Sequence, residues 1–179
     1  MTLTESVIAV LREWHAPDSD QDGLRHAVLA FVLGCPDACR RACVSGHITA
    51  SAMLLDENNC ALLTLHPRLR RWVQLGGHCE DDDTDIFAAA LREATEESGI
   101  PGILIEPELA AINVHPVTCS LGVPTRHLDL QFIGRAPAGA TAEISDESLD
   151  LRWFPLDQLP TGADAGLHRL AARAAARSS

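Results

Sequence analysis

The first 45 residues carry apolar positions at helical spacing, separated by short polar breaks. Thr4 precedes an apolar stripe and is of a type that begins helices. A later apolar run ends at Gly34 and Pro36, which interrupt helices. The helical segments expected from this pattern are residues 5–14, residues 24–33 and a short turn over residues 37–44.

Beyond His47 the apolar period shortens to that of β-strands. Short β-like runs surround a polar turn at residues 56–59, which predicts a hairpin. The strands expected are residues 48–55, 60–65, 72–75, 110–114, 126–134 and 151–154. Two later helices are expected over residues 85–98, ending at Gly99, and over residues 165–177.

The order of these elements predicts an α+β fold, because helices, a hairpin, a helix, strands and a final helix do not alternate as βαβ units. We expect a mixed α/β sandwich. The change of period divides the chain into an N-terminal helical extension, residues 1–45, and a main domain, residues 46–179.

Charge excludes one class of partner. The chain has 14 Lys and Arg against 25 Asp and Glu, a net charge of -11. Proteins that bind long nucleic acids need a basic surface, so such a partner is not expected. A small phosphate compound remains compatible with this charge if a divalent cation mediates the contact.

No apolar run approaches the roughly 20 residues that a membrane span requires. The longest covers residues 27–33, and the first 12 residues lack the basic-then-apolar order of a secretion signal. We therefore expect a cytoplasmic protein without a membrane partner.

Three of the six cysteines share a regular spacing. Cys35, Cys39, Cys43 and His47 are four residues apart, which would place them along one side of a helix. A zinc site is one interpretation, although its ligands usually come from two segments. Buried free thiols are the interpretation that we favour.

The predicted helix at residues 85–98 carries an unusual cluster of acids. Glu93, Glu96 and Glu97 lie three and four residues apart and therefore share a face, with Arg92 as the nearby cation. Carboxylate oxygens are the ligands that Mg²⁺ prefers, and substrate phosphates often complete its coordination. A solvated acidic helix face is the alternative for this cluster taken by itself.

Residues 92–100 read Arg-Glu-Ala-Thr-Glu-Glu-Ser-Gly-Ile, which matches the second half of the Nudix box. Gly76 and Gly77 stand where the loop glycines of that family stand, and residues 151–160 resemble its late strand and turn. The chain thus resembles the Nudix hydrolases over residues 47–160. The resemblance implies a Nudix-like α/β/α sandwich with a mixed β-sheet and hydrolysis of a nucleoside diphosphate linked to another group, X.

The resemblance also implies roles for individual residues. The metal ligands would be Glu93, Glu96, Glu97 and the Gly76 carbonyl, holding Mg²⁺ or, in its place, Mn²⁺. Glu93, Glu96 and Arg92 would be catalytic, and Glu147 in a late loop is a further candidate for the general base. The substrate would be a small nucleotide-like diphosphate.

The loop before the helix departs from the family pattern. Thr84 stands eight residues before Arg92, where the family has Glu, and Asp83 stands six residues after Gly77. The loop is therefore one residue longer, and Asp83 takes the place of the Glu. In the family that Glu steadies the loop, in part through the box Arg, so the resemblance implies that Asp83 or Asp85 does so here through Arg92 with a shorter reach. We expect Gly77 to supply backbone freedom.

Other residues have interpretations that the sequence leaves open. His78, His115 and His127 are each either structural or in contact with phosphate. Trp72 is more consistent with the core than with stacking on a base. The basic loop with Arg68, Arg70 and Arg71 is more consistent with a solvated surface than with phosphate binding.

Two other functions stay open beside hydrolysis. One is an isopentenyl-diphosphate-isomerase-like enzyme, for which Cys79 near the box would be the reactive cysteine. The other is a non-catalytic nucleotide sensor on the same fold. Neither X nor the role of residues 1–45, as a homodimer interface or a lid, follows from the sequence.

Overall fold

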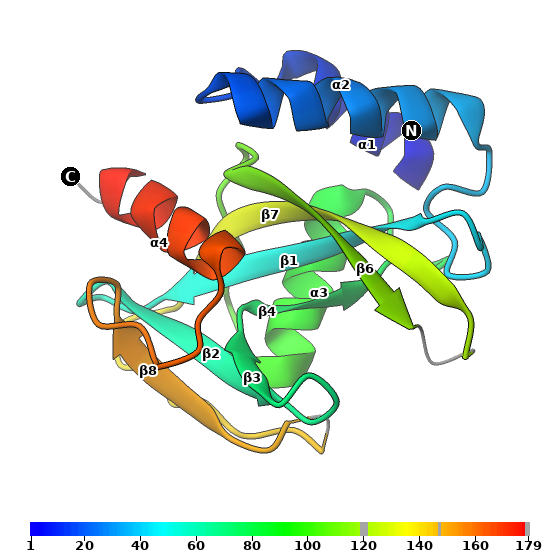
Figure 1. The fold of residues 1–179 in the computed structure, drawn as a ribbon. Coiled ribbons are helices and arrows are strands. Elements are labelled where there is room, and N and C mark those ends of the chain that lie inside the picture. Colours follow the sequence, from blue (N-terminus) through cyan, green and yellow to red (C-terminus); the bar gives the residue numbers. More distant parts are fainter. Residues whose placement is uncertain (119–121, 147, 178–179) are drawn as a thin grey trace.

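The computed structural model describes residues 1–118, 122–146 and 148–177 (Figure 1). Its elements in chain order are α1 (Leu3–Glu13), α2 (Ser19–Gly34), β1 (His47–Leu55), β2 (Cys60–His66), β3 (Arg71–Val73), β4 (Leu75–His78), α3 (Ile86–Ser98), β5 (Leu104–Ile105), β6 (Ala111–Thr118), β7 (Pro124–Arg135), β8 (Leu151–Pro155) and α4 (Ala165–Arg177).

The strands form one mixed, curled sheet. Its main path runs β3-β2-β1-β7-β5, with β4 beside β1, β6 beside β7 and β8 beside β2. The pair β1 and β7 is parallel, and the other pairs are antiparallel. The α+β class and the mixed sheet are confirmed.

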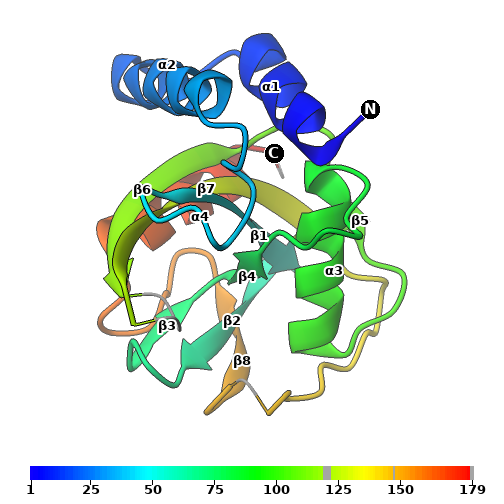
Figure 2. The same cartoon turned by 90° about the vertical axis from the view of Figure 1, so that its right-hand side faces the viewer.

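Helices cover both faces of the central strand β1, every residue of which is buried. Ile48 and Ala50 belong to a core shared with α1, α2 and the start of α3, whereas Met53 and Leu55 pack with α4. This division follows from the strand period of two, which sends neighbouring side chains to opposite faces. Figures 1 and 2 show α1 and α2 together above the sheet, whereas α4 packs against another part of the sheet.

The first two helices begin earlier than the apolar pattern predicts. Thr2, not Thr4, caps α1: its hydroxyl accepts from the Glu5 amide at 3.2 Å, and its own amide donates to the Glu5 carboxylate at 2.7 Å. Such a box needs Glu three residues after the cap, and Thr4 has Val7 there. Asp18 caps α2 by accepting from the Gln21 amide at 2.8 Å.

Two further differences concern short segments. Residues 35–46 form turns rather than a helix, so the four-residue spacing of the cysteines does not align them on one side. The strand β5 has only two residues, too few to show a period.

The N-terminal helices are joined to the rest of the chain by buried hydrogen bonds. The side-chain NH₂ of Gln21 donates to the backbone carbonyl of Ile112 at 3.0 Å, and the side-chain oxygen of Gln21 accepts from the backbone amide of Ile112 at 2.7 Å. The Ser6 hydroxyl accepts from the Ile86 amide at 3.0 Å, at the first residue of α3. The division into an extension, residues 1–45, and a domain, residues 46–179, stays a prediction.

None of the helices within the described ranges is both long and apolar enough to span a membrane.

Replacing Gln21 by Ala is expected to destabilise the protein by about 2–4 kcal/mol, because both backbone groups of buried Ile112 lose their partner. Urea unfolding followed by circular dichroism measures the change. Gly23→Ala is the control in the same helix, where a Cβ meets nothing within 4 Å. This control should gain about 0.5–1 kcal/mol. Equal stability of Gln21→Ala and the native protein would contradict the bridging role.

Candidate active site

Helix α3 is oriented by its two ends and by its apolar face. The Asp85 side chain caps it by accepting from the Ala88 amide at 2.9 Å, and Gly99 ends it with a left-handed φ of 67°. Ala90 and Ala94 are fully buried, each in one of two apolar clusters that also contain alternate residues of β1. The acidic residues therefore project from the side that faces the Gly76–Gly77 turn.

The guanidinium of Arg92 connects this helix to the preceding loop. Its Nε and Nη2 each donate to one Asp83 carboxylate oxygen at 3.0 Å, and Nη2 also donates to the His78 carbonyl at 2.8 Å. Its Nη1 donates to Glu93 and to Glu96, both at 3.1 Å. The Asp83 carboxylate, together with Glu93, raises the pKa of Arg92 above its already high value, so the guanidinium stays charged.

Asp83 occupies the loop position where the resemblance implies a Glu. Its side chain is only 5% exposed, and its second oxygen also accepts from the Glu80 amide at 2.7 Å. The shorter acid thus reaches Arg92 in a loop that is one residue longer. The role of Asp83 in supporting the loop stays a prediction.

The other two box acids lie against the glycine turn. The Gly76 amide donates to the Glu97 carboxylate at 2.8 Å. A Cβ built on Gly77 would stand 2.6 Å from a Glu93 oxygen, so only glycine allows this approach. Gly76 has a φ of 153°, where a side chain would collide with Ser51.

The three glutamates differ in exposure and direction. Glu93 and Glu97 are nearly buried, whereas the Glu96 side chain is 60% exposed. Glu97 bonds the Gly76 amide and Glu96 bonds Arg92, so within the described residues the three carboxylates do not converge on one point. Their oxygen donors suit a hard divalent cation, to which the exposed Glu96 can turn. Glu147 lies outside the described residues.

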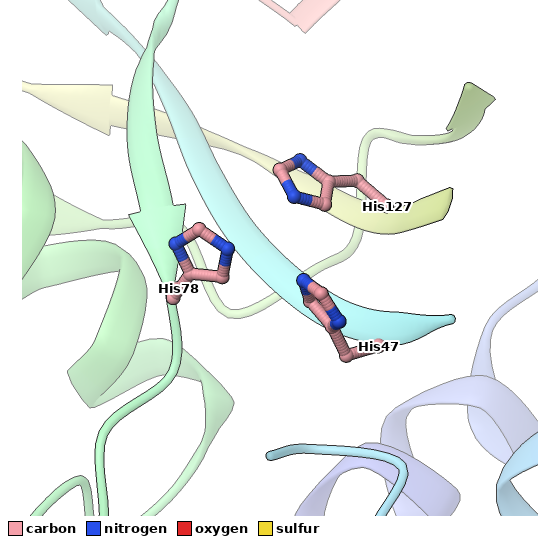
Figure 3. Close-up of side chains that lie close together, drawn as sticks. All are labelled: His47, His78 and His127. Atoms are coloured by element: carbon pink, nitrogen blue, oxygen red, sulfur yellow. The ribbon is translucent and has the colours of Figure 1, made fainter. Parts of the chain in front are cut away.

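Four histidines meet at the end of the sheet beside this loop. The rings of His47, His78 and His127 lie 4.9–5.0 Å apart between centroids, and Figure 3 shows these three side chains together. The ring of His115 lies 5.3 Å from that of His127. Burial lowers the pKa of His78 to about 4 and that of His127 to about 3, so both rings are neutral near pH 7. The sequence indicates a possible role for each of these histidines but does not predict that they form a cluster.

The cysteines do not form the zinc site that their spacing allowed. Cys35 and Cys43 have sulfur atoms 3.2 Å apart, but Cys39 is buried and receives a hydrogen bond from Thr4. His47 turns to the other histidines instead. The reason is that residues 35–46 form turns and not one helix.

Trp72 and Arg71 have structural partners. Trp72 packs edge-on against Phe154 at 5.0 Å in the core near α4, as its position beside a strand predicts. Arg71 pairs with Asp164 at 3.1 Å on the surface.

Cys79 does not have the environment of a reactive thiol. Burial raises the pKa of this side chain well above its ordinary value, which disfavours the thiolate. This environment weighs against the isomerase-like alternative, which needs a reactive cysteine.

Solved structures show the same fold at low sequence identity. A Caenorhabditis elegans Ap4A hydrolase has a TM-score of 0.57 at 19% identity, covering 73% of this chain and 96% of its own. A MutT protein from Methanosarcina mazei Go1 has a TM-score of 0.55 at 20% identity over 75% and 96%. A UDP-X diphosphatase has a TM-score of 0.56 at 15% identity over 100% and 98%.

No curated protein matches the sequence. The family model of the NUDIX domain matches residues 46–174, which is most of the chain and contains both the glycine turn and the acidic helix. The chain therefore belongs to the Nudix family and is a hydrolase of diphosphate bonds.

Proposed function

We propose that this protein hydrolyses a nucleoside diphosphate linked to a second group, X, using Mg²⁺ or, in its place, Mn²⁺. The proposed metal ligands are Glu93, Glu96, Glu97 and the Gly76 carbonyl. The observation that carries the proposal is the Arg92 network, which joins the acidic helix to the loop after the glycine turn, together with the Gly76 amide that donates to Glu97. Family membership supports a divalent metal in general, and the oxygen donors favour Mg²⁺ over softer ions.

The proposed reaction needs a metal ion that activates water and a general base that accepts a proton. When bound, the metal would polarise the attacking water and screen the phosphate charge. Glu93, held beside Gly77 by packing and by Arg92, is our candidate to accept the proton from that water. Glu96 and Glu147 are the other candidates for this base.

Arg92 acts as a positioning residue. Its charge is engaged by Asp83 and by the His78 carbonyl, so it sets the separation between loop and helix. That separation determines where a diphosphate can lie over the carboxylates, and small displacements of such groups cost much of the rate.

A panel of candidate substrates identifies the group X. The matched structures include enzymes named for Ap4A and for UDP-X, and the UDP-X diphosphatase matches the whole chain, with the N-terminal helices included. Uridine diphosphates linked to a sugar or another group therefore come first in the panel. Dinucleoside polyphosphates, ADP-ribose, oxidised nucleotides and coenzyme A follow.

With Mg²⁺, the protein is expected to turn over at least one of these compounds, and a chelator should abolish the turnover. Glu97→Gln should lower kcat/KM by about 100-fold or more, because changing even the outer partners of a metal site costs about 10- to 100-fold. Phosphate or nucleotide release, followed chromatographically, measures both effects.

The matched control is Glu13→Gln, an exposed carboxylate at the end of α1. It should keep full activity, and circular dichroism should show both variants folded. Near-native turnover of Glu97→Gln would refute the ligand assignment. Tight binding of a nucleotide without turnover would instead support the sensor function.

The pair Arg92 and Asp83 should be strongly coupled, because it makes two charge-assisted hydrogen bonds with little exposure. A double-mutant cycle with Arg92→Gln and Asp83→Asn is expected to give about 1–3 kcal/mol of coupling in unfolding free energy.

The control cycle uses Arg71 and Asp164, a pair of similar length that is more than one-third exposed. Its coupling should stay below about 1 kcal/mol. Equal coupling in the two cycles would mean that the Arg92 pair is an ordinary surface ion pair.

A further inference from the structure

Three of the clustered histidines are brought together by strand pairing alone. His47 is the first residue of β1 and stands directly opposite His127 on the parallel strand β7. His78 is the last residue of β4 and pairs with Thr49 on the other side of β1. The three imidazoles therefore come from three adjacent strands at one end of the sheet (Figure 3).

The rings converge on a common point. One nitrogen atom of each of His47, His78 and His127 can be chosen so that all lie within 4.8 Å of one another. A tetrahedral zinc ion has Zn–N bonds of about 2.0–2.1 Å, which places its ligand nitrogens about 3.3 Å apart. Small side-chain rotations are enough to close this difference.

His47 is built like a metal ligand with a supporting hydrogen bond. Only 1% of it is exposed, and its Nδ1 lies 3.2 Å from the Cys43 carbonyl oxygen. A carbonyl oxygen only accepts, so Nδ1 carries the proton and Nε2 carries the lone pair. A hydrogen bond of this kind orients the histidine ligands of metal sites.

Among the residues that the structure describes, the Nε2 atoms of His47 and His127 are buried without a hydrogen-bond partner. Leaving such a buried polar atom unsatisfied destabilises the folded state, so native proteins rarely do so without a reason. The next position on the same face behaves differently. Asp129, two residues after His127, accepts from Thr49, Ser51 and two glutamine side chains.

We propose that His47, His78 and His127 bind a transition-metal ion of the zinc type, at a site separate from the carboxylates of α3. Three imidazoles and no carboxylate form a donor set that suits Zn²⁺, Co²⁺, Ni²⁺ or Cu²⁺, whereas Mg²⁺ prefers oxygen. Three protein ligands leave a fourth position open for water or for an anionic group. His115, which contacts the His127 ring, borders the cluster.

The two sites are connected through His78. Its side chain belongs to the histidine cluster, while its backbone carbonyl accepts from Arg92 in the acidic network. An ion on the imidazoles would therefore fix the start of the loop that Arg92 and Asp83 hold at its other end. The histidine site does not depend on the proposed hydrolysis.

A competing occupant is a phosphate group held without metal. Arg41 and Arg68 are exposed and both lower the pKa of His78, so they bring positive charge toward the cluster. Such charges favour an anion. The buried Nε2 atoms of His47 and His127 favour a cation, and their effect outweighs that of the arginines because exposed charges are screened by salt.

The test uses the full chain, stripped of metal with a chelator and held in excess Mg²⁺ to occupy the carboxylates. Titration calorimetry with Zn²⁺ is expected to show one tight site. Co²⁺ in its place should give the visible bands of a nitrogen-ligated ion without the near-ultraviolet absorption of a thiolate complex. The Co²⁺ spectrum needs no variant, so it remains decisive if a histidine variant fails to fold.

His127→Gln should weaken Zn²⁺ binding by about 100-fold or more, since loss of a direct ligand exceeds the cost of losing an outer partner. His168→Gln, on the exposed face of α4, is the control and should bind as the native protein does. Cys43→Ser should also keep the site, because only the Cys43 backbone carbonyl contributes to it.

Three outcomes would overturn the proposal. One is the absence of Zn²⁺ binding in the presence of Mg²⁺. Another is binding that Cys43→Ser removes and His127→Gln retains, which would assign it to the sulfurs of Cys35 and Cys43. The last is inorganic phosphate that binds the metal-free protein at these histidines while Zn²⁺ does not. Retention of Zn²⁺ by Glu97→Gln would separate this site from the catalytic carboxylates, whatever the result for hydrolysis.

Discussion

The fork of hydrogen bonds from Arg92 holds the loop and the acidic helix at a set separation. Two of its nitrogens share the Asp83 carboxylate, and the same group reaches the His78 carbonyl and two glutamates. A guanidinium can do this because it carries five donors in one plane and stays charged. The loop has one residue more than the family pattern, and its acid, Asp83, is one carbon shorter than Glu. The ion pair between Arg92 and Asp83 forms despite both differences.

The central strands carry two kinds of surface. On β1, alternate side chains such as Ile48 and Ala50 enter the apolar core, while Thr49 and Ser51 bind Asp129. The parallel register with β7 places polar residues of both strands side by side, because both strands have the same period of two. The resulting row of polar side chains begins at Ser51, Thr49 and Asp129 and ends at His47 and His127. The interior of the curled sheet is therefore not a continuous apolar core.

The N-terminal helices contribute to the position of the site. Ser6 accepts from the first amide of α3, and Gln21 binds both backbone groups of Ile112 on β6. Both contacts satisfy backbone groups that would otherwise be buried without partners. Residues 1–45 therefore stabilise the helix that carries the box as well as the strand that carries His115.

Local sequence determined the parts of this protein that depend on neighbours along the chain. The spacing of Arg92, Glu93, Glu96 and Glu97 predicts one acidic helix, and Gly99 predicts where it ends, because helix geometry and its left-handed cap are local properties. The α+β class and most strands followed from the same kind of pattern, but the single strand expected at residues 72–75 is two, β3 and β4. The prediction that α1 begins after Thr4 was wrong because Thr2, and not Thr4, has the Glu three residues later that completes a capping box. The strand β5 was not predicted because two residues are too few to show a period.

Only the tertiary structure decided which distant side chains meet. His47 and His127 are 80 residues apart, and their contact depends on the register of a parallel strand pair that no local pattern specifies. The regular Cys-Cys-Cys-His spacing pointed to neighbours in sequence, yet His47 lies with residues from β4 and β7. A helix or strand is chosen by interactions within a few residues, whereas a cluster such as this one exists only after the sheet has brought three strands together.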